Sequence, residues 1–336
     1  MQGARTCLQC GHAIRGLSLV CEQCGATAEA HPQQLSPALA GPARPAGPVR
    51  VKAAFDRRGF RSLMFGDESG LSSLHRSVAA CDHVRTNPKF ARAAQTCWSH
   101  LCWQVDDPIH AFAAPATHES QPFRCEQCGE SPAASAQSVI VLSSGMVVFA
   151  GLLASLVAAP LLIDRSGQRI AVAKHRLAEC VTPMRPPDFV GGTAAKSLFE
   201  RAGQATSDPG VLPLARDIAR GIVLAVFAHE LGHIAYGHVR GVRSLLEIER
   251  NTERDADSFA ASVLATLPNP DRSLLGSIIF WACVSRRARQ LGGETETTHP
   301  FSEARIDAMI TSMPSAMEVL GSVHGLTRQD LVQFAR

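Results

Sequence analysis

Apolar residues recur at helical spacing in several stretches of the chain and alternate over a shorter one. Residues 71–103 carry apolar side chains three or four positions apart, and Asn87-Pro88 interrupts this pattern, which predicts two helices. Three further helices are predicted over residues 214–240, 247–267 and 273–291. The run "IHAFAAP" at 109–115 predicts a short strand. These elements predict a mainly helical α+β fold.

The longest apolar stretch is "SVIVLSSGMVVFAGLLASLVAAPLLID" at 138–164, and it allows two interpretations. By length and hydropathy, residues 139–163 qualify as a membrane span. However, Ser143-Ser144-Gly145 divides the stretch into a β-branched run and a shorter apolar run, which is typical of a buried strand followed by a helix. Basic residues flank both sides, so they assign no membrane orientation. We favour the buried strand and helix, with a membrane anchor as the alternative.

Composition fits a folded intracellular protein. The chain has 336 residues, of which 46% are hydrophobic and 19% charged, enough apolar material for a sizeable core. The formal net charge of +3 gives no reason to expect a nucleic acid or an anionic membrane as partner. The start "MQGARTCLQCGH" lacks the apolar core of a signal peptide, so a cytoplasmic location is expected.

Six of the 11 cysteines form three C-x-x-C pairs, a pattern typical of metal ligands in a reducing compartment. Two pairs fall within residues 1–28 and resemble the zinc ribbons found at many bacterial protein termini, so four thiolates are predicted to hold a structural zinc: Cys7, Cys10, Cys21 and Cys24. The alternative is free or redox-active thiols. Residues 29–50, rich in Pro, Ala and Gly, predict a linker, and residues 51–336 form the main domain. The ribbon is a candidate docking module for a protein partner.

The sequence "HELGH" in the predicted helix 214–240 is the main candidate for chemistry. His229 and His233 are four residues apart and therefore project from one helix face, where both imidazoles can bind one zinc. Glu230 is placed to act on a water as general base without being a ligand. The alternative is an amphipathic helix that carries histidines by chance. His238 is expected to be a structural residue, hydrogen-bonded at the helix end. Gly232 and Gly237 are poor helix formers and indicate the close approach of another backbone.

A catalytic zinc needs a third protein ligand and an open position. The next predicted helix contains "NTERDADSFA", in which Glu253 and Asp257 lie four residues apart on one face. We assign Glu253 as the third zinc ligand. Asp257 is expected to accept a hydrogen bond from a ligand histidine and so set its tautomer. The alternative is an ordinary solvated face with two carboxylates.

Four motifs of this chain resemble the zinc metallopeptidase (gluzincin) family that includes the CAAX prenyl proteases, HtpX and the mitochondrial Oma protease. They are "HELGHIAYGH", "ERDAD", "THPFSEARI", and "AFAAP" with "VIVLSSGMV", and they extend over residues 71–313. The resemblance implies a zincin-like domain with a small edge sheet, in which residues 139–142 form the edge strand and Gly145 begins a helix. Soluble phage-exclusion zinc proteases share the same signature.

The resemblance also implies roles for two residues near the C-terminus. His299 is expected to approach the zinc, either as a resting-state ligand or as a stabiliser of the oxyanion, and the alternative for His299-Pro300 is a loop turn. Arg305 is expected to hold a carboxylate or to pair with developing charge.

The chain departs from the family at His110, where the family has Asn, and at an insertion over residues 116–137. Paired membrane helices are not evident, so the resemblance alone does not indicate that this chain acts on the substrates of the membrane members.

The third C-x-x-C pair, Cys125 and Cys128, lies in this insertion and needs further ligands to bind metal. Cys97 and Cys102 are the nearest candidates, and Cys81 or His118 are alternatives. These groups predict a second structural zinc, against the alternative of free thiols in the core.

Together these features predict a cytoplasmic zinc-dependent endopeptidase that acts on a protein or peptide, with one catalytic zinc and at least one structural zinc. Two alternatives stay open. One is a zinc-ribbon binding protein whose second metal site is not catalytic, and the other is a membrane-anchored stress protease.

Overall fold

A computed structural model of the chain describes residues 5–6, 13–14, 70–102, 104, 109–118, 121–164, 168–181, 193–238, 246–290 and 302–334. The chain separates into two units, Met1–Val51 and Lys52–Arg336. In the first, β1 (Arg5–Thr6) pairs antiparallel with β2 (Ala13–Ile14). The four predicted ribbon cysteines and the predicted linker lie outside the described residues.

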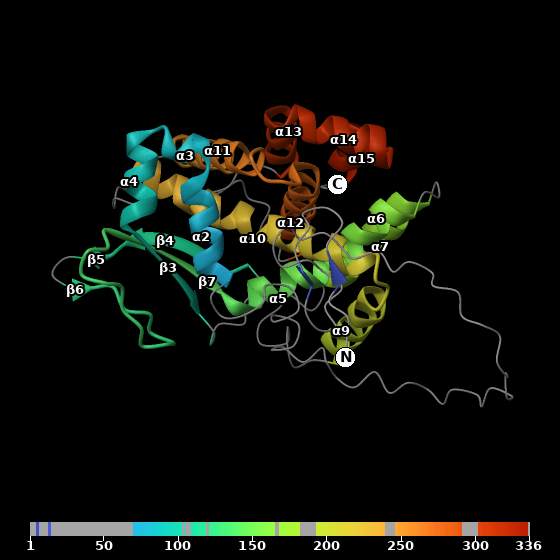
Figure 1. Ribbon diagram of the computed structural model, residues 1–336, viewed down its shortest axis with the longest axis horizontal. Coiled ribbons are helices and arrows are strands. Elements are labelled where there is room, and N and C mark those ends of the chain that lie inside the picture. The colour runs from blue at the N-terminus through green and yellow to red at the C-terminus, as the bar shows by residue number, and fades with distance from the viewer. Residues whose placement is uncertain are drawn as a thin grey trace, which may run out of the picture. The chain divides into compact units, whose positions relative to one another are not determined.

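A three-stranded sheet forms one wall of the second unit, in the order β3-β7-β4 (Figure 1). The central strand β7 (Ser138–Ser143) runs parallel to β3 (Cys97–Cys102) and antiparallel to β4 (Ala111–Pro115). All six residues of β7 are buried, as expected for a strand covered on both faces, and this explains its continuous apolar sequence. The strand expected at the edge is therefore the middle strand, and β4 and β3 form the edges.

The N-terminal helices of this unit are α2 (Gly70–Ala80), α3 (Asp82–Arg85) and α4 (Pro88–Thr96). The Asn87 side chain caps α4 by accepting from the backbone amides of Lys89 and Phe90, and Pro88 opens the helix. The second predicted helix extended through Trp98, but the chain changes at Cys97 into β3. Pairing of β3 with β7 along all six positions outweighs the helical spacing of Phe90, Ala94 and Trp98.

The long apolar stretch continues from β7 into one helical segment at the centre of the fold. It consists of α5 (Ser144–Leu153), the π-helical turn η1 (Ala154–Ala158) and α6 (Ala159–Ile163). Ser143 caps α5 by accepting from the Met146 amide. Among the described residues, one helical segment, Ser144–Ile163, is long and apolar enough to cross a membrane. The rest of the fold buries 89% of its most apolar stretch. Such burial is typical of the core helix of a globular domain.

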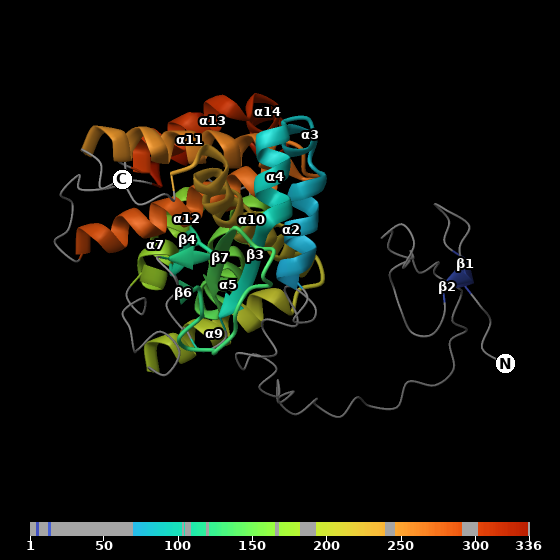
Figure 2. The same ribbon diagram turned by 90° about the vertical axis from the view of Figure 1, so that its left-hand side faces the viewer.

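The remaining helices pack around this segment and the sheet. They are α7 (Arg169–Val181), α9 (Thr193–Thr206), α10 (Val211–Tyr236), α11 (Leu246–Leu264), α12 (Pro270–Gln290), α13 (Ser302–Ser312), α14 (Pro314–His324) and α15 (Arg328–Gln333). Helix α10 lies between the sheet and α11 in both views (Figures 1 and 2) and is buried along most of its length. The fold is thus mainly helical with a small sheet, as predicted, and α10 is its central element.

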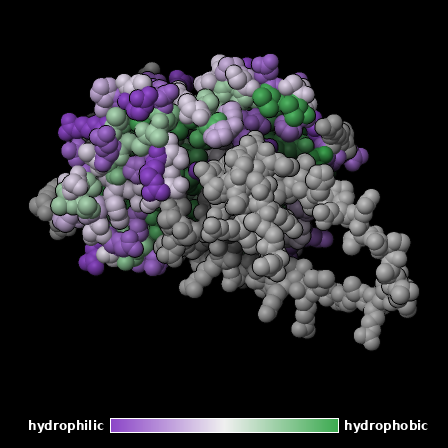
Figure 3. Space-filling view, viewed as in Figure 1, coloured by the Kyte–Doolittle hydropathy of each residue, from purple (hydrophilic) through white to green (hydrophobic). Residues whose placement is uncertain are grey.

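On the face shown in Figure 3, polar side chains cover much of the coloured surface, and apolar side chains gather over α14. This helix carries two of the large hydrophobic residues exposed within the described chain, Val319 and Val323. Single exposed valines are ordinary on a protein surface. Short strands β5 (Thr117–His118) and β6 (Gln121–Pro122) lie in the insertion that follows β4.

Candidate metal centre

Helix α10 presents His229 and His233 side by side near its C-terminal end. Their four-residue spacing places the imidazoles one turn apart, and the two Nε2 atoms are 3.1 Å from each other. His229 is buried, whereas His233 is partly exposed. The pair therefore directs two nitrogen donors to one point at the rim of the core.

Helix α11 supplies a carboxylate to the same point. Glu253 is buried, with Oε2 3.3 Å from His229 Nε2 and Oε1 3.4 Å from His233 Nε2. Ligand atoms about 2.05 Å from a tetrahedral zinc lie about 3.3 Å apart, so these separations match three corners of such a site. Two imidazoles and one carboxylate are also a donor set that zinc prefers. The residues present therefore fit a zinc ion.

Small residues let α10 and α11 approach closely beside these ligands. A Cβ added at Gly232 would lie 3.0 Å from Cα of Ala256. A larger residue at Gly232 or at Ala256 would therefore push the two helices apart. Gly237 has a different role from the predicted close approach. It ends α10 with a positive φ of 81°, and among the described residues no atom outside its own helix and chain neighbours lies within 4 Å of where its Cβ would be.

A buried ion pair supports His229 from behind. Asp257 Oδ1 lies 2.9 Å from His229 Nδ1, which directs the other ring nitrogen, Nε2, towards Glu253 and His233. Arg305 on α13 donates two hydrogen bonds to the Asp257 carboxylate, at 2.6 and 2.7 Å. Burial alone would raise the pKa of Asp257, but Arg305 and His229 hold it below its usual value. Burial alone would lower the pKa of His229, but the hydrogen bonds that its ring donates to Asp257 and Glu253 raise it to about 9 in the metal-free protein.

Arg305 is enclosed by the protein. Its guanidinium carbon lies 3.6 Å from the ring centre of Trp281 on α12, and the residue is 5% exposed. Of the two roles expected for Arg305, the geometry provides the first, a grip on a carboxylate. Trp281, which the sequence did not single out, also packs edge-on against His229, with ring centres 5.7 Å apart. Arg305 and Trp281 therefore position the ligand system from inside the core.

The second candidate ligand, His233, also has a supporting partner. His233 Nδ1 is 3.2 Å from Nδ1 of His238, which follows the helix end at Gly237. The His238 amide donates to the His233 carbonyl at 2.8 Å, which fixes the position of this turn. Tyr236 stacks on His238, with ring centres 5.6 Å apart. His238 thus contacts a ligand ring as well as the helix end.

The two predicted catalytic groups besides Arg305 differ in how far they can be placed. Glu230 directly follows His229 on α10 and is partly buried. Residues next to each other on a helix point about 100° apart, so Glu230 is beside the ligand pair without sharing its face. His299 lies outside the described residues.

A second group of potential metal ligands lies on the outer face of the sheet. It consists of His100, Cys102, Cys125 and Cys128. Cys102, Cys125 and Cys128 were predicted to meet, but Cys97 is not part of the group, and His100 takes the fourth place. Alternate residues of a strand point to opposite faces, so Cys97 faces the main core while His100 and Cys102 face the insertion. Of the alternatives, Cys81 instead accepts a hydrogen bond from the Thr266 hydroxyl.

Comparison with known proteins bears on the first of these sites. The family model of Peptidase U49 matches residues 204–321, which include α10, α11, α12 and α13. No curated protein and no solved structure matches the chain. The matched segment holds the candidate ligands and their supports: His229, His233, Glu253, Asp257, Trp281 and Arg305. The comparison supports a peptidase, and a peptidase acts on protein or peptide substrates.

Proposed function

We propose that this protein is a zinc-dependent endopeptidase of the gluzincin type. The observation that carries the proposal is the convergence of His229, His233 and Glu253, with ligand atoms 3.1–3.4 Å apart, inside the segment that matches a peptidase family. These three residues would hold the zinc. When bound, zinc lowers the pKa of water towards neutrality and polarises a peptide carbonyl.

Four other residues have proposed roles in the reaction. Glu230 accepts the proton of the attacking water and passes it to the leaving amine, a role that suits a carboxylate next to a ligand but not itself a ligand. Asp257 holds the His229 ring in the tautomer that leaves Nε2 available, and Arg305 keeps Asp257 ionised and in place. His299 is kept as a proposed oxyanion stabiliser or resting-state ligand.

The test of this proposal is Glu230→Gln. This variant keeps the size of the side chain but cannot accept the proton, so it should retain zinc and the fold and lose cleavage. Glu318→Gln, an exposed change on α14, is the matched control. Zinc content is measured by mass spectrometry. Cleavage is measured on a proteome-derived peptide library and on those proteins whose amounts fall when the wild type is expressed. Cleavage by Glu230→Gln at the wild-type rate would overturn the mechanism.

The same experiment separates the enzyme from a zinc-binding regulatory protein. A wild type that holds zinc at His229 and His233 yet cleaves no peptide of the library would favour a binding role, with the predicted ribbon as its docking module. When the cells are fractionated, we expect the expressed protein in the soluble fraction, because the fold buries the apolar segment α5–α6. Recovery only with membranes would favour the membrane-anchored alternative.

A further inference from the structure

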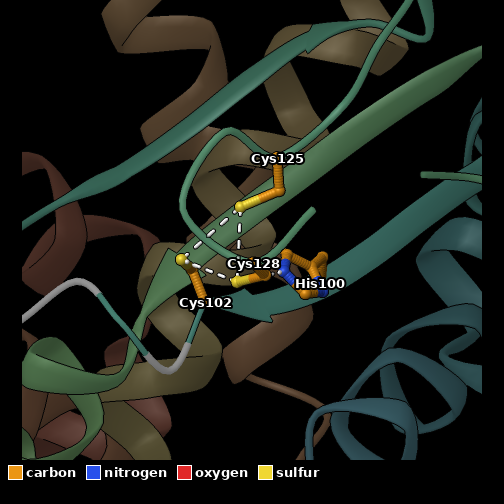
Figure 4. A group of neighbouring side chains, drawn as sticks. All are labelled: His100, Cys102, Cys125 and Cys128. Carbon is orange, nitrogen blue, oxygen red and sulfur yellow. Dashed lines mark hydrogen bonds between the residues drawn. The ribbon is translucent and has the colours of Figure 1, made fainter. Parts of the chain in front are cut away.

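The second ligand group is built from one strand and one loop. His100 and Cys102 are two positions apart on β3 and so share a face, and Cys125 and Cys128 come from the loop after β6. Figure 4 shows the three sulfur atoms directed towards one another, with the His100 ring beside Cys128. The fold thus brings together two pairs of side chains that lie more than twenty residues apart along the chain.

The spacing of the four groups is close to that of a tetrahedral zinc site. Cys102 Sγ lies 3.1 Å from Cys128 Sγ and 3.5 Å from Cys125 Sγ, and the two loop sulfurs are 3.4 Å apart. His100 Nε2 lies 3.3 Å from Cys128 Sγ. With zinc–sulfur bonds of about 2.3 Å and a zinc–nitrogen bond of about 2.05 Å, the corners of a tetrahedron lie about 3.5–3.8 Å apart. An outward shift of a few tenths of an ångström at each sulfur would accommodate the ion.

The loop has the backbone needed to present two thiolates. Gly129 follows Cys128 with a positive φ of 72°, a conformation that few other residues adopt readily. Its amide donates to the Cys125 carbonyl at 2.7 Å, and the Cys125 amide donates to the Glu130 carbonyl at 2.8 Å. These bonds close the turn around the C-x-x-C pair, so both sulfurs are directed to the same side.

The histidine is held in the orientation of a ligand. His100 Nδ1 lies 3.2 Å from the Glu130 carboxylate, which leaves Nε2 directed towards the sulfurs. The indole of Trp98 stacks on the imidazole at 4.7 Å, with the ring planes 6° apart. His100, Cys102 and Cys125 are buried. A ligand ring with a carboxylate partner, packed in a sheltered position, is the usual environment of a metal-bound histidine.

We infer that His100, Cys102, Cys125 and Cys128 bind a structural zinc ion. Four protein ligands leave no open coordination position, which is the mark of a structural rather than a catalytic site. The outer face of the sheet needs such support, because its buried apolar cluster is small: Cys102, Ala116, Cys125, Val139 and Val141. The ion joins the insertion 116–137 to β3. It is a site distinct from the proposed catalytic zinc, and it does not depend on that proposal.

Two cysteines of the same strand provide a matched test. In the full-length protein, Cys102→Ser should remove one of the zinc ions found in the wild type, whereas Cys97→Ser should remove none. His100→Cys, which preserves four ligands, should keep the ion, and His100→Ala should bind it more weakly. Zinc per chain is measured by mass spectrometry after gel filtration. Equal zinc in Cys102→Ser and the wild type, or a loss in Cys97→Ser, would overturn the assignment.

A second readout follows the insertion itself. Arg124 is exposed, and it is the only Lys or Arg between Arg92 and Arg165, so trypsin cleavage there gives defined fragments. We expect Cys102→Ser to be cut at Arg124 faster than Cys97→Ser. Equal rates would contradict a role for zinc in holding the insertion.

A third measurement tests the site even if the Cys102→Ser protein does not fold. The full chain with Cys7→Ser and Cys10→Ser loses the predicted ribbon site but keeps every residue of the unit 52–336. Loaded with cobalt(II), it should still show the absorption of cobalt bound to several thiolates. Absence of this absorption would refute the site.

Discussion

Asp257→Asn tests whether the buried ion pair behind His229 supports zinc binding. The substitution keeps the shape of the side chain but removes its charge. Asp257 now accepts from His229 Nδ1 and twice from Arg305. An asparagine offers one oxygen to these donors and turns an amide group towards one of them. His229 therefore loses the partner that orients its ring.

The expected loss can be worked from these contacts. Removing the partner of a ligand histidine lowers metal affinity by about 10–100-fold, which corresponds to about 1.4–2.7 kcal/mol. Arg305 adds to the loss because its Nη2 also lies 3.7 Å from Oε2 of Glu253. Once Asp257 no longer neutralises it, Arg305 competes with zinc for this ligand, so the affinity should fall by about 100-fold. The fold should also lose about 3–5 kcal/mol, because one partner of a buried ion pair is left uncompensated.

Zinc affinity is measured by competition with a chromophoric chelator, and stability by urea unfolding of the metal-free protein. The double variant Asp257→Asn with Arg305→Met separates the two effects. It removes the unpaired charge, so most of the stability should return, while zinc affinity should stay below that of the wild type because His229 still lacks its carboxylate. If Asp257→Asn bound zinc as tightly as the wild type, Asp257 would have no role in the site.

Two further predictions concern protonation and helix packing. In the metal-free protein the raised pKa of His229 means that its proton stabilises the fold fully below about pH 6.5, and that this contribution is lost as the pH rises through about 9. Thermal unfolding across this range should show that loss for the wild type and a flatter profile for His229→Ala; parallel profiles would argue against the raised pKa. Gly232→Ala should weaken zinc binding and cost about 1–3 kcal/mol of stability, because its new methyl meets Ala256. Gly237→Ala should cost about 1–2 kcal/mol through its positive φ and leave zinc affinity unchanged, and an equal loss of zinc in both variants would contradict the packing argument.

Local patterns in the sequence were sufficient to locate α10, the helix that carries the candidate ligands His229 and His233. The predicted helix 214–240 agrees with α10 (Val211–Tyr236) because its apolar residues continue around the helix, as expected for a buried element. The strand at 139–142 was likewise evident from its β-branched residues. The same reasoning failed at β3, because Trp98 continues the helical spacing of α4 and nothing local signals a partner forty residues later.

The details of the sites depended on information that spacing does not contain. Cys97 and Cys102 are equally good thiol ligands, and the pleat of β3 decides between them by placing them on opposite faces. That face also selects His100, which an alternating pattern from Cys102 could have suggested had the strand been recognised. The role of Arg305 was open between two possibilities until its position against Asp257 and Trp281 was known.

The ion pair between Arg305 and Asp257 also affects when the candidate metal site can be completed during synthesis. Arg305 comes 76 residues after His229, so a nascent chain exposes the whole of the "HELGH" segment well before the arginine leaves the ribosome. Domains fold largely as units once their sequence is complete. Until α13 emerges, Asp257 has no buried cation to hold it and His229 has no fixed orientation. The proposed catalytic site is therefore complete only once α13, near the end of the matched segment, has been translated.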